Sequence, residues 1–253
     1  MHFTKLLYCA VLLAVVLLIV QQRASDIAAA PAPDNVYDPA KATASVTGKV
    51  MFEGTRPSPV MLPMTPECVN AHNGPGFDEI ITVSENNAIK DVFVYAKEGA
   101  EKWTYSAPTQ PVLLDQIGCH YVPHIFGIMV NQPLEILNSD PFFHNLHSIA
   151  AQPANDAFNL GLPIKGMKVT RTFGTPEVIP LKCDIHRWMS SYIHVVKNPF
   201  YAVSDADGSF AIRNLPAATF TLEAWHEKLG TQTKKVTLTS GKSQEVTFTF
   251  KEP

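Results

Sequence analysis

The sequence predicts an all-β protein, and two observations carry that prediction. Short apolar runs with strand-like alternation recur along the chain, and 20 prolines and 13 glycines separate them. No stretch after residue 25 keeps the periodicity of an amphipathic helix. With 253 residues, 46% of them hydrophobic, the chain is long enough for one large or two small domains with buried cores.

The N-terminal region predicts export. Lys5 precedes an apolar run at 6–20, and a tail of small residues follows, so we expect a signal peptide over residues 1–25. The run has 15 residues, fewer than the about 20 of a typical spanning helix. An uncleaved anchor that tethers the chain to the membrane through 6–20 is the alternative. Either way, we expect a periplasmic or extracytoplasmic protein. The Ala- and Pro-rich residues 26–44 predict a disordered linker.

The folded part begins after this linker as a series of predicted strands. Their approximate places are 45–54, 80–84, 88–99, several runs within 112–140, alternating residues in 158–183, 191–196, and a strand–turn series over 201–230 and 234–251. Short strands at this spacing are typical of sandwiches and barrels. The formal net charge of −3, without basic runs, gives no reason to expect a nucleic-acid partner.

Cysteine usage in an exported chain points to one unusual thiol. Apart from Cys9 in the apolar run, the cysteines are Cys68, Cys119 and Cys183. Thiols tend to pair in an oxidising compartment, and an odd number leaves one over. If Cys68 bonds to Cys119, Cys183 remains free. A metal that binds Cys183 as a thiolate would explain its persistence, and a simple buried cysteine is the alternative.

Residues 183–189, CDIHRWM, place three soft or borderline metal donors in one loop. Cys183, His186 and Met189 follow at intervals of three residues, so a compact turn can wrap them around a single ion. Copper sites for electron transfer combine a thiolate, two imidazoles and a weak axial thioether. His144 lies 39 residues before Cys183, after a strand-like run that ends in turn formers, and can supply the second imidazole.

This pattern resembles the cupredoxins, the blue copper proteins, over about residues 112–198. The matching features are a Tyr-Val-Pro at 121–123, a run that ends Asn138-Ser-Asp140, the pair His144-Asn145, and a C-x2-H-x2-M loop with amicyanin-like spacing. The resemblance implies a Greek-key sandwich that holds one type 1 copper ion.

By that resemblance, the metal ligands are His144, Cys183, His186 and Met189. Asn145 would join the His144 strand to the ligand loop and steady the thiolate. Pro180 departs from the family pattern, because we expect it to interrupt the strand before Cys183.

A second resemblance covers the rest of the folded chain. The segments Ser204–Phe210, Asn214–Pro216 and Phe220–Ala224 are similar to the carboxypeptidase-regulatory-like domains, which are small transthyretin-like β-sandwiches. That family's first two strands match Val46–Val50 and Val92–Ala96. The implied organisation is a sandwich of residues 45–111 and 199–253 with the copper domain, 112–198, inserted. A tandem order is the alternative.

The expected function is transfer of single electrons between redox partner proteins, such as c-type cytochromes or a membrane or periplasmic oxidoreductase. The chain would then not be an enzyme by itself. The alternatives are copper binding for storage or delivery, and a structural or adhesion role. The sequence lacks the His-x-His pairs that additional copper centres would need. A second metal site that involves His124, His147 or His226 remains open at this point.

Overall fold

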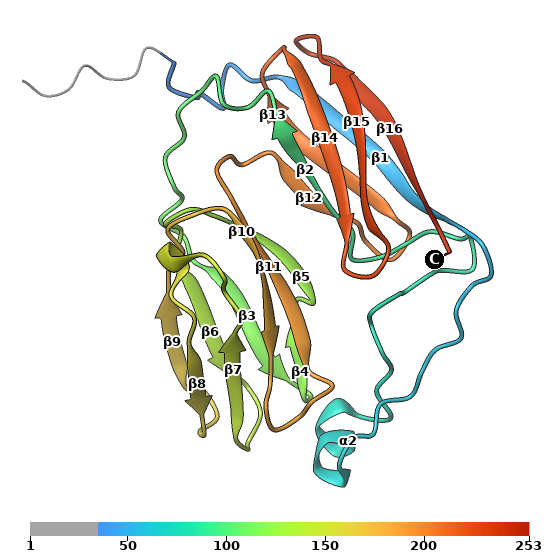
Figure 1. Cartoon of the computed structure of the whole chain (residues 1–253), viewed down its shortest axis with the longest axis vertical. Coiled ribbons are helices and arrows are strands. Elements are labelled where there is room, and N and C mark those ends of the chain that lie inside the picture. The colour runs from blue at the N-terminus through green and yellow to red at the C-terminus, as the bar shows by residue number, and fades with distance from the viewer. Residues whose placement is uncertain (1–34, 253) are drawn as a thin grey trace, which may run out of the picture. The chain divides into compact units, whose positions relative to one another are not determined.

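The computed structural model describes residues 35–252, which form strands, one α-helix and one 3-10 helix (Figure 1). The all-β prediction is therefore confirmed for the described residues. The signal peptide or anchor, residues 1–25, and most of the predicted linker lie outside them. Within residues 35–252, no helix is long and apolar enough to span a membrane.

Order begins before the predicted start of the folded part. The Tyr37 N–H donates to the Thr104 carbonyl at 3.0 Å, and the Tyr37 hydroxyl donates to the Asn214 carbonyl at 2.7 Å. Ala42 is buried ahead of the first strand. The linker predicted to reach residue 44 is therefore wrong for its last residues, because the Tyr37 ring packs on the sandwich and fixes the chain there.

Two of the four sheets are built from strands at both ends of the described chain, and we call these strands the outer sandwich. One sheet has the order β13-β1-β16 and the other β12-β2-β14-β15. The bounds are β1 Ala44–Glu53, β2 Phe93–Glu98, β12 Tyr201–Val203, β13 Ser209–Leu215, β14 Thr219–His226, β15 Gly230–Thr237 and β16 Ser243–Lys251. Most of their buried side chains are aliphatic or aromatic and form one cluster.

The other two sheets come from a continuous stretch between β2 and β12, which we call the inner module. The sheet orders are β5-β11-β10-β7-β8 and β4-β3-β6-β9. The bounds are β3 Val112–Ile117, β4 His120–Val122, β5 Ile125–Met129, β6 Leu134–Asn138, β7 His144–Ser148, β8 Asn159–Leu162, β9 Lys168–Arg171, β10 Glu177–Lys182 and β11 Ser190–Val196, with the 3-10 helix η1 at Pro153–Asn155. Strand pairs are formed within this module or within the outer sandwich.

The stretch between β1 and β2 carries the helix α2, Pro66–His72, which the sequence analysis did not predict. Its signal is local: Thr65 caps the helix by accepting from the Cys68 N–H at 3.4 Å, and Pro66 occupies the first turn. The strand predicted at 80–84 is wrong, since this segment forms only an isolated bridge, Val83 with Ile89. Cys68 of α2 is disulfide-bonded to Cys119 in the β3–β4 turn, which is the pairing that leaves Cys183 free.

Candidate metal centre

The ligand loop is a closed turn between β10 and β11. The Cys183 N–H donates to the Met189 carbonyl at 3.2 Å, and the Met189 N–H donates to the His186 carbonyl at 2.8 Å. These bonds close the loop at both ends, so its residues are held by backbone geometry as well as by packing. Cys183 and Met189 are buried in the core of the inner module, whereas His186 is partly exposed.

The first strand residue of β7, His144, meets this loop from the neighbouring strand. His144 Nδ1 lies 3.0 Å from His186 Nδ1, and Cys183 Sγ lies 3.9 Å from the same His186 nitrogen. The three donor atoms offered by His144, Cys183 and His186 all lie within 4.8 Å of one another. The structure therefore brings three of the four predicted ligands together. Met189 belongs to the same closed loop, and its role as the axial ligand stays a prediction.

Hydrogen bonds around the sulfur favour its thiolate form. The His186 N–H donates to Cys183 Sγ at 3.3 Å. Burial by itself raises the pKa of the Cys183 thiol, but hydrogen bonds from His144 and from backbone N–H groups outweigh it and hold the pKa below its ordinary value. Asn145 Oδ1 accepts the Asp184 N–H at 2.9 Å and, when Cys183 is protonated, its S–H at 3.2 Å. Asn145 thus joins the His144 strand to the ligand loop, as the cupredoxin resemblance implied.

The second nitrogen of His144 is fixed by Asp140, a residue that the sequence analysis did not assign to the site. Asp140 Oδ2 lies 2.8 Å from His144 Nε2, and the carboxylate also accepts the N–H groups of Gly118 and Cys119, each at 2.8 Å. Burial raises the pKa of Asp140, but these bonds outweigh that effect and lower it. A carboxylate on one nitrogen of an imidazole orients the ring and strengthens its other nitrogen as a donor.

The donor set fits a soft or borderline metal ion. For bond lengths such as those of zinc, about 2.0 Å to nitrogen and about 2.3 Å to sulfur, tetrahedral geometry places the nitrogens roughly 3.3 Å apart and sulfur roughly 3.5 Å from each. The observed separations of 3.0 Å and 3.9 Å are close to these values. Two imidazoles, a thiolate and a nearby thioether favour copper over harder ions, so the site is consistent with copper binding.

The remaining histidines named in the sequence analysis are not brought together. His124 contacts the Ser190 carbonyl and the Glu227 carboxylate, and His147 Nδ1 lies 3.0 Å from Asp184 Oδ2. His226 Nδ1 accepts two backbone N–H groups of its own turn. Among the described residues, no group of three close donors includes any of them.

Aromatic rings enclose the candidate ligands. The Phe142 ring centre lies 5.3 Å from that of His144 and 6.2 Å from that of His186, while Trp188 lies 5.3 Å from His186. The Trp188 indole N–H donates to the Cys119 carbonyl at 3.1 Å. This contact ties the ligand loop to the β3–β4 turn, where the disulfide is attached.

The expectation that Pro180 interrupts the strand before Cys183 is wrong. Pro180 lies inside β10, opposite Tyr192 of β11. The Tyr192 N–H donates away from Pro180, to the His124 carbonyl at 2.9 Å, so the pair lies where the ladder needs no proline N–H. On its other side, the Pro180 carbonyl accepts the Ile149 N–H at 2.9 Å.

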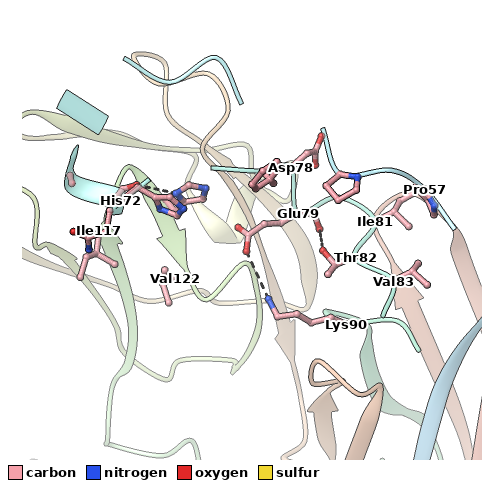
Figure 2. A pocket seen from close by; sticks show the side chains of 16 residues that line it. Pro57, His72, Asp78, Glu79, Ile81, Thr82, Val83, Lys90, Ile117 and Val122 are labelled. Carbon is pink, nitrogen blue, oxygen red and sulfur yellow. Dashed lines mark hydrogen bonds and ion pairs between the residues drawn. The ribbon is translucent and has the colours of Figure 1, made fainter. Parts of the chain in front are cut away.

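A pocket of about 660 Å³ lies beside the β3–β4 turn (Figure 2). His72 and Ala71 of α2 line it together with Gly118 and His120, the neighbours of Cys119. Figure 2 shows Lys90 reaching toward Glu79 across the pocket, and their charged atoms lie 3.8 Å apart. None of the predicted metal ligands lines this pocket.

Comparison with known proteins gives one family match and several structural similarities. The family model described as carboxypeptidase regulatory-like domain matches residues 193–251. No curated protein matches the chain. A copper-containing nitrite reductase (NirK) from Thermus scotoductus SA-01 is similar at 25% identity with a TM-score of 0.32, over 35% of this chain and 23% of that chain.

Smaller copper proteins are similar over most of their own length. A mutant of amicyanin in the Cu(I) state shows 18% identity and a TM-score of 0.30, over 34% of this chain and 82% of that one. A purple cupredoxin from Nitrosopumilus maritimus shows 25% identity and a TM-score of 0.27, over 30% of this chain and 82% of that one. The chain thus contains a carboxypeptidase regulatory-like domain at residues 193–251 and is similar in structure to amicyanin-like cupredoxins over about 35% of its length.

Proposed function

We propose that this chain is an extracytoplasmic type 1 copper protein that carries single electrons between redox partners. The observation that carries the proposal is the convergence of Cys183 and His186 of the closed loop with His144 of β7, because the three donor atoms lie within 4.8 Å of one another. The Cys68–Cys119 disulfide supports export, because disulfides persist in oxidising compartments. We further propose that residues 112–198 are inserted into the regulatory-like sandwich, since β2 and β12 pair with each other across them.

In this proposal, His144, Cys183 and His186 hold the ion and Met189 supplies the weak fourth donor. Bound copper supplies a one-electron couple between Cu(II) and Cu(I). The protein's contribution is rigidity: Asp140 fixes the His144 ring, Asn145 joins the strand to the loop, and the closed turn holds Cys183 and His186. A site that is held in this way changes little between the two oxidation states, which favours fast electron exchange. We propose redox proteins such as c-type cytochromes as partners.

The decisive experiment is the visible spectrum of the copper(II)-loaded protein. We expect an intense thiolate-to-copper absorption band, a reversible potential and a stoichiometry of one copper per chain. Cys183→Ser removes the band, while Ser191→Ala, a buried change in β11 outside the ligand loop, keeps it. A copper-loaded wild-type protein without the band contradicts the proposal.

A role in copper storage or delivery is distinguished from electron transfer by how fast the protein loses copper, and not by its visible spectrum. An electron carrier retains its ion through many redox cycles, so a competing chelator at neutral pH should remove copper slowly. Rapid loss of copper to the chelator, together with the absence of a reversible potential, would favour delivery instead.

A further inference from the structure

The disulfide lies directly against the candidate metal centre. The sulfurs of Cys68 and Cys119 and a ring nitrogen of His186 all lie within 4.8 Å of one another. Cys119 Sγ, a carboxylate oxygen of Asp140 and a nitrogen of His144 form another group of the same size. Three sulfurs and two imidazoles are therefore concentrated in one buried region, although the cupredoxin-like arrangement uses only one of the sulfurs.

We propose that Cys68, Cys119 and His186 form a second copper(I)-binding site, which exists only when the disulfide is reduced. Two thiolates and an imidazole are a donor set that suits Cu(I), because soft sulfur ligands select this ion. The site needs little rearrangement, since the three donors already lie within a few ångströms of each other. Because His186 belongs to both groups of donors, the reduced cysteines would compete with the His144–Cys183 centre for it.

The redox step balances with a dithiol as reductant. A dithiol gives two electrons and two protons to the Cys68–Cys119 bond, which breaks into two thiols, and the dithiol itself becomes a disulfide. When Cu(I) then binds, the thiols lose their protons to solvent and the copper keeps its oxidation state. Reoxidation of the pair by another disulfide, which takes two electrons from the thiolates and two protons from solvent and becomes a dithiol, removes both sulfur donors and releases the ion.

The structure provides a route to this bond, although both sulfurs are buried. Ala71 and His72 lie three and four residues after Cys68 and therefore on the same face of α2. They line the 660 Å³ pocket of Figure 2 together with Gly118 and His120, which flank Cys119. α2 has only 7 residues, and neither neighbouring segment is a regular strand of a sheet. In the proposal, local opening of this segment exposes the disulfide at the edge of the inner module's core, to which both cysteines belong.

Copper(I) affinity in the absence of Cys183 tests the proposal separately from the electron-carrier function. The full chain with Cys183→Ser is reduced with dithiothreitol in denaturant, refolded without oxygen, and titrated with Cu(I) against a chromophoric Cu(I) chelator. We expect one tightly bound Cu(I), and at least a hundredfold weaker binding by the same variant with its disulfide intact. Cys9 is kept in every chain, so its contribution cancels.

Two matched variants define the site. Cys68→Ser/Cys119→Ser/Cys183→Ser should bind as weakly as the oxidised form, and His186→Ala added to Cys183→Ser should weaken binding at least tenfold. Equal affinity of the reduced Cys183→Ser chain and the triple serine variant overturns the proposal. An unchanged affinity after His186→Ala overturns the site as drawn. Loss of the visible band in wild-type protein would contradict the electron carrier and leave this titration unaffected.

If the reduced variant does not refold, the reduction potential of the disulfide, measured with and without Cu(I), tests the proposal instead. If Cu(I) binds only the reduced pair, it must raise the reduction potential of the disulfide in the folded, never denatured Cys183→Ser variant, which lacks the competing thiolate. A thousandfold preference corresponds to an upward shift of about 90 mV, at about 30 mV per tenfold change. No shift with saturating Cu(I), in a protein whose disulfide reduces reversibly, contradicts the site.

Discussion

The outer sandwich and the inner module are both β-structures with buried cores, but they differ in what they bury. Of the sixteen buried polar side chains among residues 35–252, thirteen lie between residues 112 and 198, and the three others, Ser204, Glu223 and His226, belong to the outer sandwich. Buried polar groups cost free energy unless each finds a partner. The outer sandwich therefore buries mainly apolar side chains, which stabilise the fold. The inner module buries many polar side chains at a cost in free energy, and some of them, such as Asp140 and Asn145, contact the candidate ligands.

A pair of large-to-small substitutions tests whether the two cores stabilise one cooperative unit. Phe220 of the outer sandwich and Phe173 of the inner module are both fully buried. Phe220→Ala and Phe173→Ala should each lower the free energy of unfolding by about 3–5 kcal/mol. Because Phe93, Ile125, Met129 and Val196 form a shared cluster between the two parts, we expect a single transition in denaturant for both variants. Two separate transitions would show that the parts unfold independently.

The copper affinity of the inner module should fall more when a buried charge is removed than when an exposed charge is removed. Asp140→Asn removes the carboxylate that holds His144 and two backbone N–H groups, so copper affinity should fall about 10- to 100-fold. Asp156→Asn, an exposed change in the same module outside the ligand loop, is the control and should change affinity less than threefold. Isothermal titration with a competing chelator measures both. Equal affinities of the two variants would remove Asp140 from the site.

The contact between the two parts should make stability depend on pH. His194 of β11 stacks on Phe93 of β2 at 3.9 Å, and burial lowers the pKa of His194 to about 3. The unfolded chain binds this proton below about pH 6.5, whereas the folded chain does not until about pH 3. Stability contributed by His194 is thus complete above pH 6.5 and falls, as pH decreases through this window, by up to about 1.4 kcal/mol per pH unit.

His194→Phe removes that titration and keeps an aromatic ring against Phe93. Urea unfolding of the variant at pH 7 and pH 5 should show a smaller decrease in stability than the wild type shows. Other titrating groups, including His124 with its Glu227 partner, are present in both proteins and cancel in the difference. Identical decreases would mean that His194 is not buried as a neutral imidazole.

The smallest change in stability is expected for Met189→Leu, a substitution that tests whether Met189 binds the metal or only packs in the core. Met189→Leu conserves volume and should cost less than about 1.5 kcal/mol. It should nevertheless shift the visible band and raise the reduction potential of the copper-loaded protein, because a weak thioether donor is lost. Met129→Leu, a buried methionine outside the ligand loop, should leave both spectral properties unchanged. An unaltered spectrum after Met189→Leu would exclude Met189 as a ligand.

The parts of the candidate site that depend on residues close together in the sequence could be predicted. The spacing of Cys183, His186 and Met189 within one loop, and the position of His144 after a strand, are visible in the sequence. Asp140 was missed because its role depends on the β3–β4 turn, which lies more than twenty residues earlier and folds back to donate two N–H groups. The helix α2 was missed although Thr65-Pro66 is a local start signal, because 7 residues are too few to show a period.

The pairing of β1 has a consequence for the order in which the protein is assembled. β1 lies between β13 and β16, and its parallel ladder with β16 extends from Ser45 to Glu53. Neither neighbour exists until more than 150 further residues have been synthesised, whereas every strand of the inner module lies in one continuous stretch. A chain that emerges from its N-terminus can therefore complete the ligand loop while its first strand still waits for the last one.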